Sequence, residues 1–262
     1  MQNYWHKQTV DKPLFPDLLW SRPEHQNQAG KLLIIGGNAH GFSAAGEAFT
    51  AAQKAGIGVA RVLLPDSLQK TVGKVFAAGE FAPSTPSGSF SQPALAEFLA
   101  MSQWADGVLL AGDLGRNSET AIALEKFAKD YRGQLTITKD AVDYFNHVPT
   151  ILDRPKTTLV PSFAQLQKLA TSSHFAKAFR FDMDFLRLTD TLHEFSLQHP
   201  AAIITEHLEN LFVTVNGQVS STNLGFDDKI WRVKTAASSS VWWLQNPNKT
   251  FEALTCSLAG VS

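Results

Sequence analysis

Short apolar runs alternate with amphipathic stretches along most of this chain. Residues 31–35 form an apolar run that stops at a pair of glycines, which predicts a buried strand ending in a tight turn. Residues 43–55 are rich in alanine and close on Gly56, as expected for a helix with a C-terminal glycine. The next apolar run, 58–64, is stopped by a proline and predicts a second strand.

The same alternation continues towards the C-terminus. Further strands are predicted at 107–111, 135–138, 157–160 and 201–205. Asn117 or Ser118 can cap a helix that runs to about Tyr131, and Ser162 with Gln165 has the spacing of a capping box. Residues 175–199 are amphipathic and predict one or two helices.

The last part of the chain predicts a hairpin and two helices. Residues 210–215 and 218–220 flank the pair Asn216-Gly217, which favours a type I′ turn, and helices are expected over about 235–245 and 249–260. Strands that alternate with helices indicate an α/β fold with a mostly parallel sheet covered on both faces, here with an antiparallel edge hairpin. We expect residues 1–262 to form one domain.

The carboxyl ends of these strands indicate where a ligand would bind, because open α/β sheets bind ligands beyond those ends. The segments at these ends are Gly36-Gly37, Gly112-Asp113-Leu114-Gly115, Asp140, Pro161-Ser162 and Thr205-Glu206.

Composition narrows the range of functions. The 262 residues carry a net charge of −1, so nothing attracts the whole chain to nucleic acid or to anionic lipid. A single cysteine excludes an internal disulfide and a Cys-rich zinc site, and the eight histidines show no metal-ligand spacing, so we expect no protein-held metal. No apolar run has the length of a membrane span, and no signal peptide is recognisable. We therefore expect a cytoplasmic protein.

Two glycine loops carry the first candidate chemistry. Residues 36–41 link a strand to a helix, an arrangement that lets backbone N–H groups approach an anion or that serves as a plain tight turn. Their spacing fits neither the dinucleotide fingerprint nor the Walker A loop. Residues 112–116 have the same placement, and Arg116 would either pair with a phosphate or cover a helix end.

Several short motifs occur in an order that is similar to that of a known family. They are His25–Gly30 before the first strand, Gly36-Gly37-Asn38 with Gly41-Phe42-Ser43-Ala44-Ala45, Ala111–Gly115, Thr138–Val142, Leu159–Gln165 and Phe251-Glu252-Ala253. In this order they resemble the ADP/ATP-dependent NAD(P)H-hydrate dehydratase family of the ribokinase-like superfamily. The resemblance covers roughly residues 20 to 260.

The resemblance implies a ribokinase-like three-layer sandwich and a lyase that repairs hydrated NAD(P)H. In that reaction ADP or ATP, with Mg²⁺, phosphorylates the hydroxyl group of the hydrate before elimination. It also implies a homo-oligomer. The substrate-binding positions that it implies are Gly41, Ala44, Ala45, Gly112, Asp113, Gly115 and Ser162. The nucleotide-binding positions that it implies are Thr205, Glu206, Arg232 and Val233.

The chain departs from the family at the positions that carry the chemistry. The family's Lys-Gly, His and Glu correspond here to Thr205-Glu206, Ser162 and Gln165. Its Gly-x-Gly-Asp, the anion hole with the catalytic Asp, falls on residues 231–234, which places Lys234 where the base should be. A lysine with an ordinary pKa of about 10.4 is protonated at neutral pH and cannot take up a proton.

Asp228 is a weak candidate for a replacement base, because Asp227 and Asp228 lie just before this segment. The alternative is that both belong to a solvated turn. Three functions therefore stay open. They are an NAD(P)H-hydrate dehydratase with reduced or lost activity, a non-catalytic nucleotide- or NAD(P)-binding pseudoenzyme, and a small-molecule kinase of the wider superfamily. All three bind a small-molecule nucleotide and neither nucleic acid nor a membrane.

Overall fold

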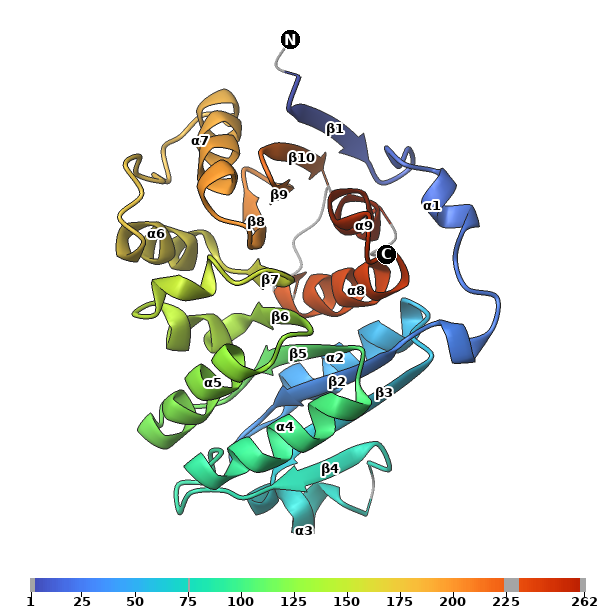
Figure 1. Ribbon diagram of the computed structural model, residues 1–262, viewed down its shortest axis with the longest axis vertical. Coiled ribbons are helices and arrows are strands. Elements are labelled where there is room, and N and C mark those ends of the chain that lie inside the picture. The colour runs from blue at the N-terminus through green and yellow to red at the C-terminus, as the bar shows by residue number, and fades with distance from the viewer. Residues whose placement is uncertain (1–2, 75, 224–230, 260–262) are drawn as a thin grey trace.

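A computed structural model of the chain describes residues 3–74, 76–223 and 231–259 (Figure 1). The strands are β1 (Trp5–Thr9), β2 (Lys31–Gly36), β3 (Val59–Pro65), β4 (Gly79–Ala82), β5 (Gly107–Gly112), β6 (Gln134–Thr138), β7 (Thr157–Val160), β8 (Ala202–His207), β9 (Asn210–Val215) and β10 (Gln218–Asn223). The helices are α1 (Asp17–Trp20), α2 (Ser43–Lys54), α3 (Gln69–Val72), α4 (Leu95–Trp104), α5 (Ser118–Asp130), α6 (Phe163–Ser172), α7 (Phe185–Gln198), α8 (Trp231–Gln245) and α9 (Thr250–Ser257).

One ten-stranded sheet runs through the molecule in the order β1-β10-β9-β8-β7-β6-β5-β2-β3-β4. From β8 to β4 neighbouring strands are parallel, whereas β9 is antiparallel to both β8 and β10. The expected α/β fold with a mostly parallel sheet and an antiparallel hairpin is therefore confirmed. The hairpin turns at Asn216 and Gly217, whose φ angles of 47° and 79° are those of a type I′ turn.

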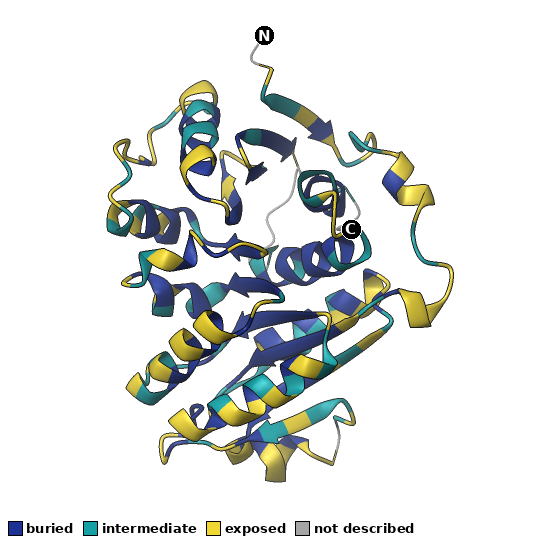
Figure 2. Cartoon of the chain, in the orientation of Figure 1, coloured by how far each residue is buried: buried dark blue, intermediate teal, exposed yellow. Residues whose placement is uncertain are grey.

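Both faces of the sheet are covered, which explains why its central strands read as continuous apolar runs. Successive side chains of a strand point to opposite faces. In β2, Leu33 and Ile35 belong to the core under α4, α5, α6 and α7. Leu32 and Ile34 belong to the core under α2 and α8. Buried residues accordingly follow the sheet and the inner faces of the helices (Figure 2).

Small side chains let α2 and α8 pack closely on the sheet and on one another. The core on this side contains Ala44, Ala48 and Ala52 of α2 and Ala236 and Ala237 of α8. Buried serines on α8 satisfy their hydroxyl groups locally, since Ser240 Oγ donates to Thr136 Oγ1 at 2.8 Å. This packing fixes the N-terminal ends of both helices beside the ends of β2, β5 and β6.

Several features differ from the sequence-based expectations, and the short elements α1, α3 and β4 were not predicted. The strand β1 lies outside the hairpin, parallel to β10, and it was not predicted because its sequence WHKQT is mostly polar. Helix α4 was also not predicted. Within the expected helical stretch 175–199 only α7 is helical, because Asp184 caps it by accepting a hydrogen bond from the Arg187 N–H at 2.8 Å. Phe175 and Phe179 precede this cap and pack against Phe195.

Among the described residues, no helix is long and apolar enough to cross a membrane.

Candidate ligand-binding site

The loops that follow β2, β5, β6 and β7 gather at one edge of the sheet, as expected for neighbouring parallel strands. The first turns of α2, α6 and α8 lie at the same edge, because each of these helices covers the sheet next to those strand ends. The predicted substrate positions of the two glycine loops are therefore neighbours in space. Their role in binding stays a prediction.

Direct hydrogen bonds join the two glycine loops. The Gly37 N–H donates to the Gly112 carbonyl at 3.0 Å, and Asn38 Nδ2 donates to the Asp113 carbonyl at 2.6 Å. Gly37, Gly112 and Gly115 all have positive φ, which glycine adopts without strain. The two loops are therefore in direct contact, and that they frame one ligand together stays a prediction.

Asp113 places a carboxylate on the N-terminal end of α2. Its Oδ2 accepts hydrogen bonds from the Ala44 N–H at 2.8 Å and from Ser43 Oγ at 3.0 Å, and its Oδ1 is 2.5 Å from Lys139 Nζ. Burial would raise the pKa of Asp113, but the hydrogen bonds from Lys139, Ala44 and Ser43 outweigh burial and lower it. A carboxylate of the chain itself thus occupies the place at α2 where a bound anion was expected.

Asp140 accepts hydrogen bonds from the second glycine loop, residues 112–116. Its two carboxylate oxygens accept hydrogen bonds from the N–H groups of Asp113 and Leu114, at 2.7 and 2.9 Å. Burial raises the pKa of Asp140, and these two hydrogen bonds only partly oppose that effect. The N–H groups of Asp113 and Leu114 in the glycine-rich loop are therefore already satisfied from within the chain.

The start of α6 is satisfied by the predicted capping box. Ser162 Oγ accepts a hydrogen bond from the Gln165 N–H at 3.3 Å, and Gln165 Oε1 accepts one from the Ser162 N–H at 3.0 Å. Gln165 Nε2 also donates to the Lys139 carbonyl at 2.8 Å. The capping box is confirmed, and Ser162 is engaged as a helix cap.

Arg232 lies in the first described turn of α8 and points to this cap. Its Nη1 donates to Gln165 Oε1 at 3.0 Å. Burial lowers the pKa of Arg232, and the nearby Asp143 and Asp140 carboxylates oppose that effect. A guanidinium group therefore lies among the polar side chains where the family pattern has its anion hole.

The other predicted nucleotide positions are less available to a ligand. Val233 is 1% exposed within the apolar core. Thr205 is buried, and its Oγ1 donates to the Pro161 carbonyl at 3.3 Å. Glu206 is exposed at the end of β8, and Lys234 lies in the first described turn of α8. The weak candidate base, Asp228, lies outside the described residues, as does Asp227.

Sequence reasoning missed Lys139 as part of this site. The residue follows β6 and has a φ of 55°, and Asp113 has a φ of 57°, so both members of their ion pair have left-handed backbones. Nothing in the sequence near Lys139 indicates that its side chain reaches across from one strand end to the next.

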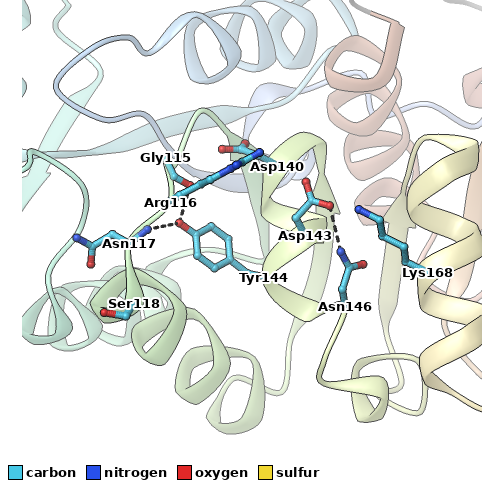
Figure 3. A pocket seen from close by; sticks show the side chains of 9 residues that line it. All are labelled: Gly115, Arg116, Asn117, Ser118, Asp140, Asp143, Tyr144, Asn146 and Lys168. Atoms are coloured by element: carbon cyan, nitrogen blue, oxygen red, sulfur yellow. Dashed lines mark hydrogen bonds between the residues drawn. The ribbon is translucent and has the colours of Figure 1, made fainter.

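A hollow opens beside Gly115, with a volume of about 600 Å³ (Figure 3). Its polar lining comes from the loop after β5, the 3₁₀ segment after β6 (Lys139–Phe145) and α6. Tyr144 stands at its wall, donating its hydroxyl hydrogen to the Gly115 carbonyl at 2.7 Å and accepting from the Asn117 N–H at 3.3 Å.

The Mg²⁺ implied by the resemblance does not fit the carboxylates described here. Both Asp113 and Asp140 already use their oxygens on N–H, hydroxyl or ammonium donors. Among the described residues, no group of three or more His, Cys, Asp and Glu side chains is placed to hold a metal ion. Magnesium prefers free carboxylate oxygens, phosphates and water, so these side chains supply it with no ready ligand.

Comparison with known proteins gives the fold. No protein-family model matches this chain, and no curated protein is similar to it in sequence. Among solved structures, a ribokinase-like superfamily protein from Enterococcus faecalis V583 is similar with a TM-score of 0.73 and 14% identity, over 99% of this chain and 86% of that one.

Two further similar structures are of enzymes with a named activity. The ADP/ATP-dependent NAD(P)H-hydrate dehydratase from Bacillus subtilis, co-crystallized with ATP and Mg²⁺, has a TM-score of 0.65 and 10% identity, over 94% of this chain and 85% of that one. Ribokinase from Cryptococcus neoformans var. grubii serotype A, in complex with ADP, has a TM-score of 0.55 and 14% identity, over 88% and 93%. At these identities the likeness shows the ribokinase-like fold.

Proposed function

We propose that this chain is a non-catalytic nucleotide-binding protein built on the ribokinase-like fold. The single observation that carries the proposal is the contact between Arg232 and Gln165. It places a fixed cation, and no carboxylate of the described residues, in the segment that corresponds to the Gly-x-Gly-Asp of the dehydratases. A cation there favours a phosphate group but cannot take a proton from a hydroxyl group.

The hydrogen bonds within the two glycine loops support the proposal that the protein does not catalyse phosphoryl transfer. A phosphoryl group in transfer needs preorganised donors around its oxygens. Here the Asp113 carboxylate uses the Ala44 N–H, and the Asp140 carboxylate uses the N–H groups of Asp113 and Leu114. These three N–H donors are therefore engaged within the chain before any ligand arrives.

The proposed ligand is ADP or ATP. NADH and NADPH are the alternative ligands, because they are also nucleotides that carry phosphate groups. Solved structures of the same fold were obtained with ATP and Mg²⁺ or with ADP, which supports the choice of these ligands. In our proposal Arg232 and Lys234 hold the phosphates at the start of α8. The homo-oligomer expected from the resemblance stays a prediction.

Calorimetric titration of the purified protein with ADP, ATP, NADH and NADPH tests the proposal. Saturable heat with at least one nucleotide is the expected result. Adenosine, which lacks phosphate, should bind much more weakly if the cations near α8 carry the interaction. Absence of heat with all four nucleotides would contradict the proposal and leave only a structural role for the fold.

The dehydratase reaction itself is the second candidate. The positive φ angles of Gly112, Asp113 and Gly115 favour it, because they preserve the backbone shape of a glycine-rich loop at the expected place. Asp228 would then be the base. Turnover of hydrated NADH by the parent protein that Asp228→Asn abolishes would favour this second candidate, whereas absence of turnover in the parent protein would favour the non-catalytic one.

A further inference from the structure

Helix α7 presents two leucines to the outside of the molecule. It packs on β9 and β10 and lies at the periphery, with exposed residues on its outer side (Figures 1 and 2). Leu186 and Leu197 of this helix are 57% and 62% exposed. Among the described residues, no other helix longer than four residues carries two large hydrophobic side chains that are exposed to this degree. Two leucines in line on one helix differ from the scattered apolar residues of an ordinary surface.

The outermost line of α7 consists of four residues, which we name the α7 stripe: Leu186, Asp190, His193 and Leu197. They follow one another at steps of four, three and four residues, so they lie within about 60° of one another around the helix. These steps are those of the a and d positions of a coiled coil. The opposite side of the helix, which includes Leu192, is buried in the core.

The α7 stripe is complementary to a second copy of itself that runs in the antiparallel direction. Leu186 of one copy then meets Leu197 of the other, and Asp190 meets His193, because each pair is symmetric about the middle of the stripe. Each contact occurs twice about a two-fold axis, as in an isologous interface. A parallel arrangement would instead place the Asp190 carboxylates of the two copies against each other, which is unfavourable.

The charged residues beside the α7 stripe follow the same symmetry. In an antiparallel pair of helices, Arg187 of one copy lies across from Glu194 of the other, on the flank next to the stripe. Within one copy, Arg187 is 3.8 Å from Asp184 and Glu194 is 2.5 Å from Lys177, and these side chains are 42–78% exposed. Opposite charges therefore face each other on this flank from both copies.

The polar centre of the α7 stripe is held in place before association. Tyr4 donates its hydroxyl hydrogen to Asp190, and its ring stacks on that of His193 with ring centroids 3.7 Å apart. His193 Nδ1 is 2.5 Å from the Gly217 carbonyl oxygen, so Nε2 is the ring nitrogen that faces the second copy. Side chains that are already fixed lose less conformational freedom on binding, which favours association.

From the exposed leucines and the symmetric charges, we propose that α7 packs antiparallel against α7 of a second copy and that the chain forms a two-fold symmetric dimer. Two helices of 14 residues bury less than the about 1,600 Å² of a standard interface, so the dissociation constant should be micromolar. The proposal does not depend on nucleotide binding near α8, because α7 and α8 cover opposite faces of the sheet.

Sedimentation equilibrium of the full-length protein tests the dimer. Between about 1 and 500 µM the parent protein should change from monomer to dimer. The double variant Leu186→Gln, Leu197→Gln should weaken the dimer at least about tenfold, because it removes the apolar contacts at both ends of the stripe. The control Ile122→Gln, Leu208→Gln replaces two other exposed apolar side chains and should change it less than about twofold. A parent that stays monomeric at about 500 µM, or equal losses in both double variants, would overturn the proposal.

Charge reversal tests the antiparallel register. Arg187→Glu and Glu194→Arg, each alone, place like charges across the interface and should weaken self-association at least about tenfold. An equimolar mixture of these two variants restores opposite charges at both positions and should dimerise within about threefold of the parent. Glu125→Arg, which reverses an exposed charge on α5, should leave the dimer unchanged. Circular dichroism confirms that each variant is folded. A mixture of the folded variants that stays monomeric would overturn the proposed pairing of α7 with itself.

Discussion

The Asp113 carboxylate and the Lys139 ammonium group form an ion pair, with Oδ1 and Nζ 2.5 Å apart, at the first turn of α2. Both residues have positive φ, a conformation that costs a residue other than glycine about 1 kcal/mol or more. The pair closes the α2 end of the site with opposite charges that belong to the chain. An internal ion pair therefore occupies the N-terminal end of α2, where a helix could otherwise bind an anion.

The ion pair should stabilise the fold at neutral pH. The side chains of Asp113 and Lys139 are 20% and 33% exposed, so Asp113→Asn should lower the free energy of unfolding by about 1–2 kcal/mol. Asp182→Asn is a matched control, because Asp182 pairs with Arg180 on an exposed surface. Its cost should be much smaller, because solvent screens an exposed pair. Urea denaturation measures both, and equal costs would contradict a special role for the pair.

The effect of Asp113→Asn should depend on pH. The folded protein lowers the pKa of Asp113 below its ordinary value of 3.8, so its stabilising effect is complete above that value. The effect is lost as the pH falls through the folded-state pKa. The difference in unfolding free energy between the parent and Asp113→Asn should therefore shrink between about pH 5 and pH 2. A difference that stays constant over that range would show that the charge of Asp113 is not its cause.

Gly112 should tolerate no side chain. Its φ is 104°, and a Cβ atom there would lie 2.7 Å from both Asp140 Oδ1 and Lys139 Cβ. Gly112→Ala should lower stability by about 2 kcal/mol or more. Gly41→Ala, in the neighbouring loop, meets no atom within 4 Å and should be nearly neutral. Thermal unfolding compares them, and a melting temperature of Gly112→Ala equal to that of Gly41→Ala would contradict the described loop geometry.

Nucleotide affinity should depend on Arg232. Arg232→Ala should weaken ADP binding about tenfold and make it less sensitive to salt, because one charge–phosphate contact is removed. Arg180→Ala, which removes the same charge on an exposed surface, is the control. Unchanged affinity and unchanged salt dependence in Arg232→Ala would show that Arg232 does not contact the nucleotide.

Binding should not need a divalent cation. The Asp113 and Asp140 carboxylates are engaged within the chain, so they offer no ready ligands to Mg²⁺. The affinity for ADP in EDTA should match that in millimolar Mg²⁺ within about threefold, which is less than 1 kcal/mol. Loss of binding in EDTA would contradict this prediction and show that the protein binds the magnesium complex of ADP.

Periodicity and turn signals predicted the parts of the fold whose stabilising contacts are local. The strand β2, the alanine-rich helix α2, the Asn117 cap and the Ser162–Gln165 capping box each have a signal within a few residues. The strand β1 has no such signal, because it is held by pairing with β10 more than 200 residues away in sequence, such as the hydrogen bond from Trp5 Nε1 to Ser221 Oγ.

The position of the candidate site could be predicted from the sequence, but the contacts among its side chains could not. Strand ends and glycines located it. That the Asp113 carboxylate would turn onto α2 and pair with Lys139 depends on two left-handed backbone positions in different loops. The contact between Arg232 and Gln165 likewise joins residues 67 positions apart, and no local pattern encodes it.

Turnover of hydrated NADH tests the central claim most directly. Purified protein is mixed with hydrated NADH, ATP or ADP, and Mg²⁺, at a nucleotide concentration that calorimetry shows to be saturating, and recovered NADH is measured by its absorbance. A non-catalytic nucleotide-binding protein predicts recovery no greater than in the protein-free blank. Recovery above the blank that disappears in Asp228→Asn would contradict it and establish a dehydratase.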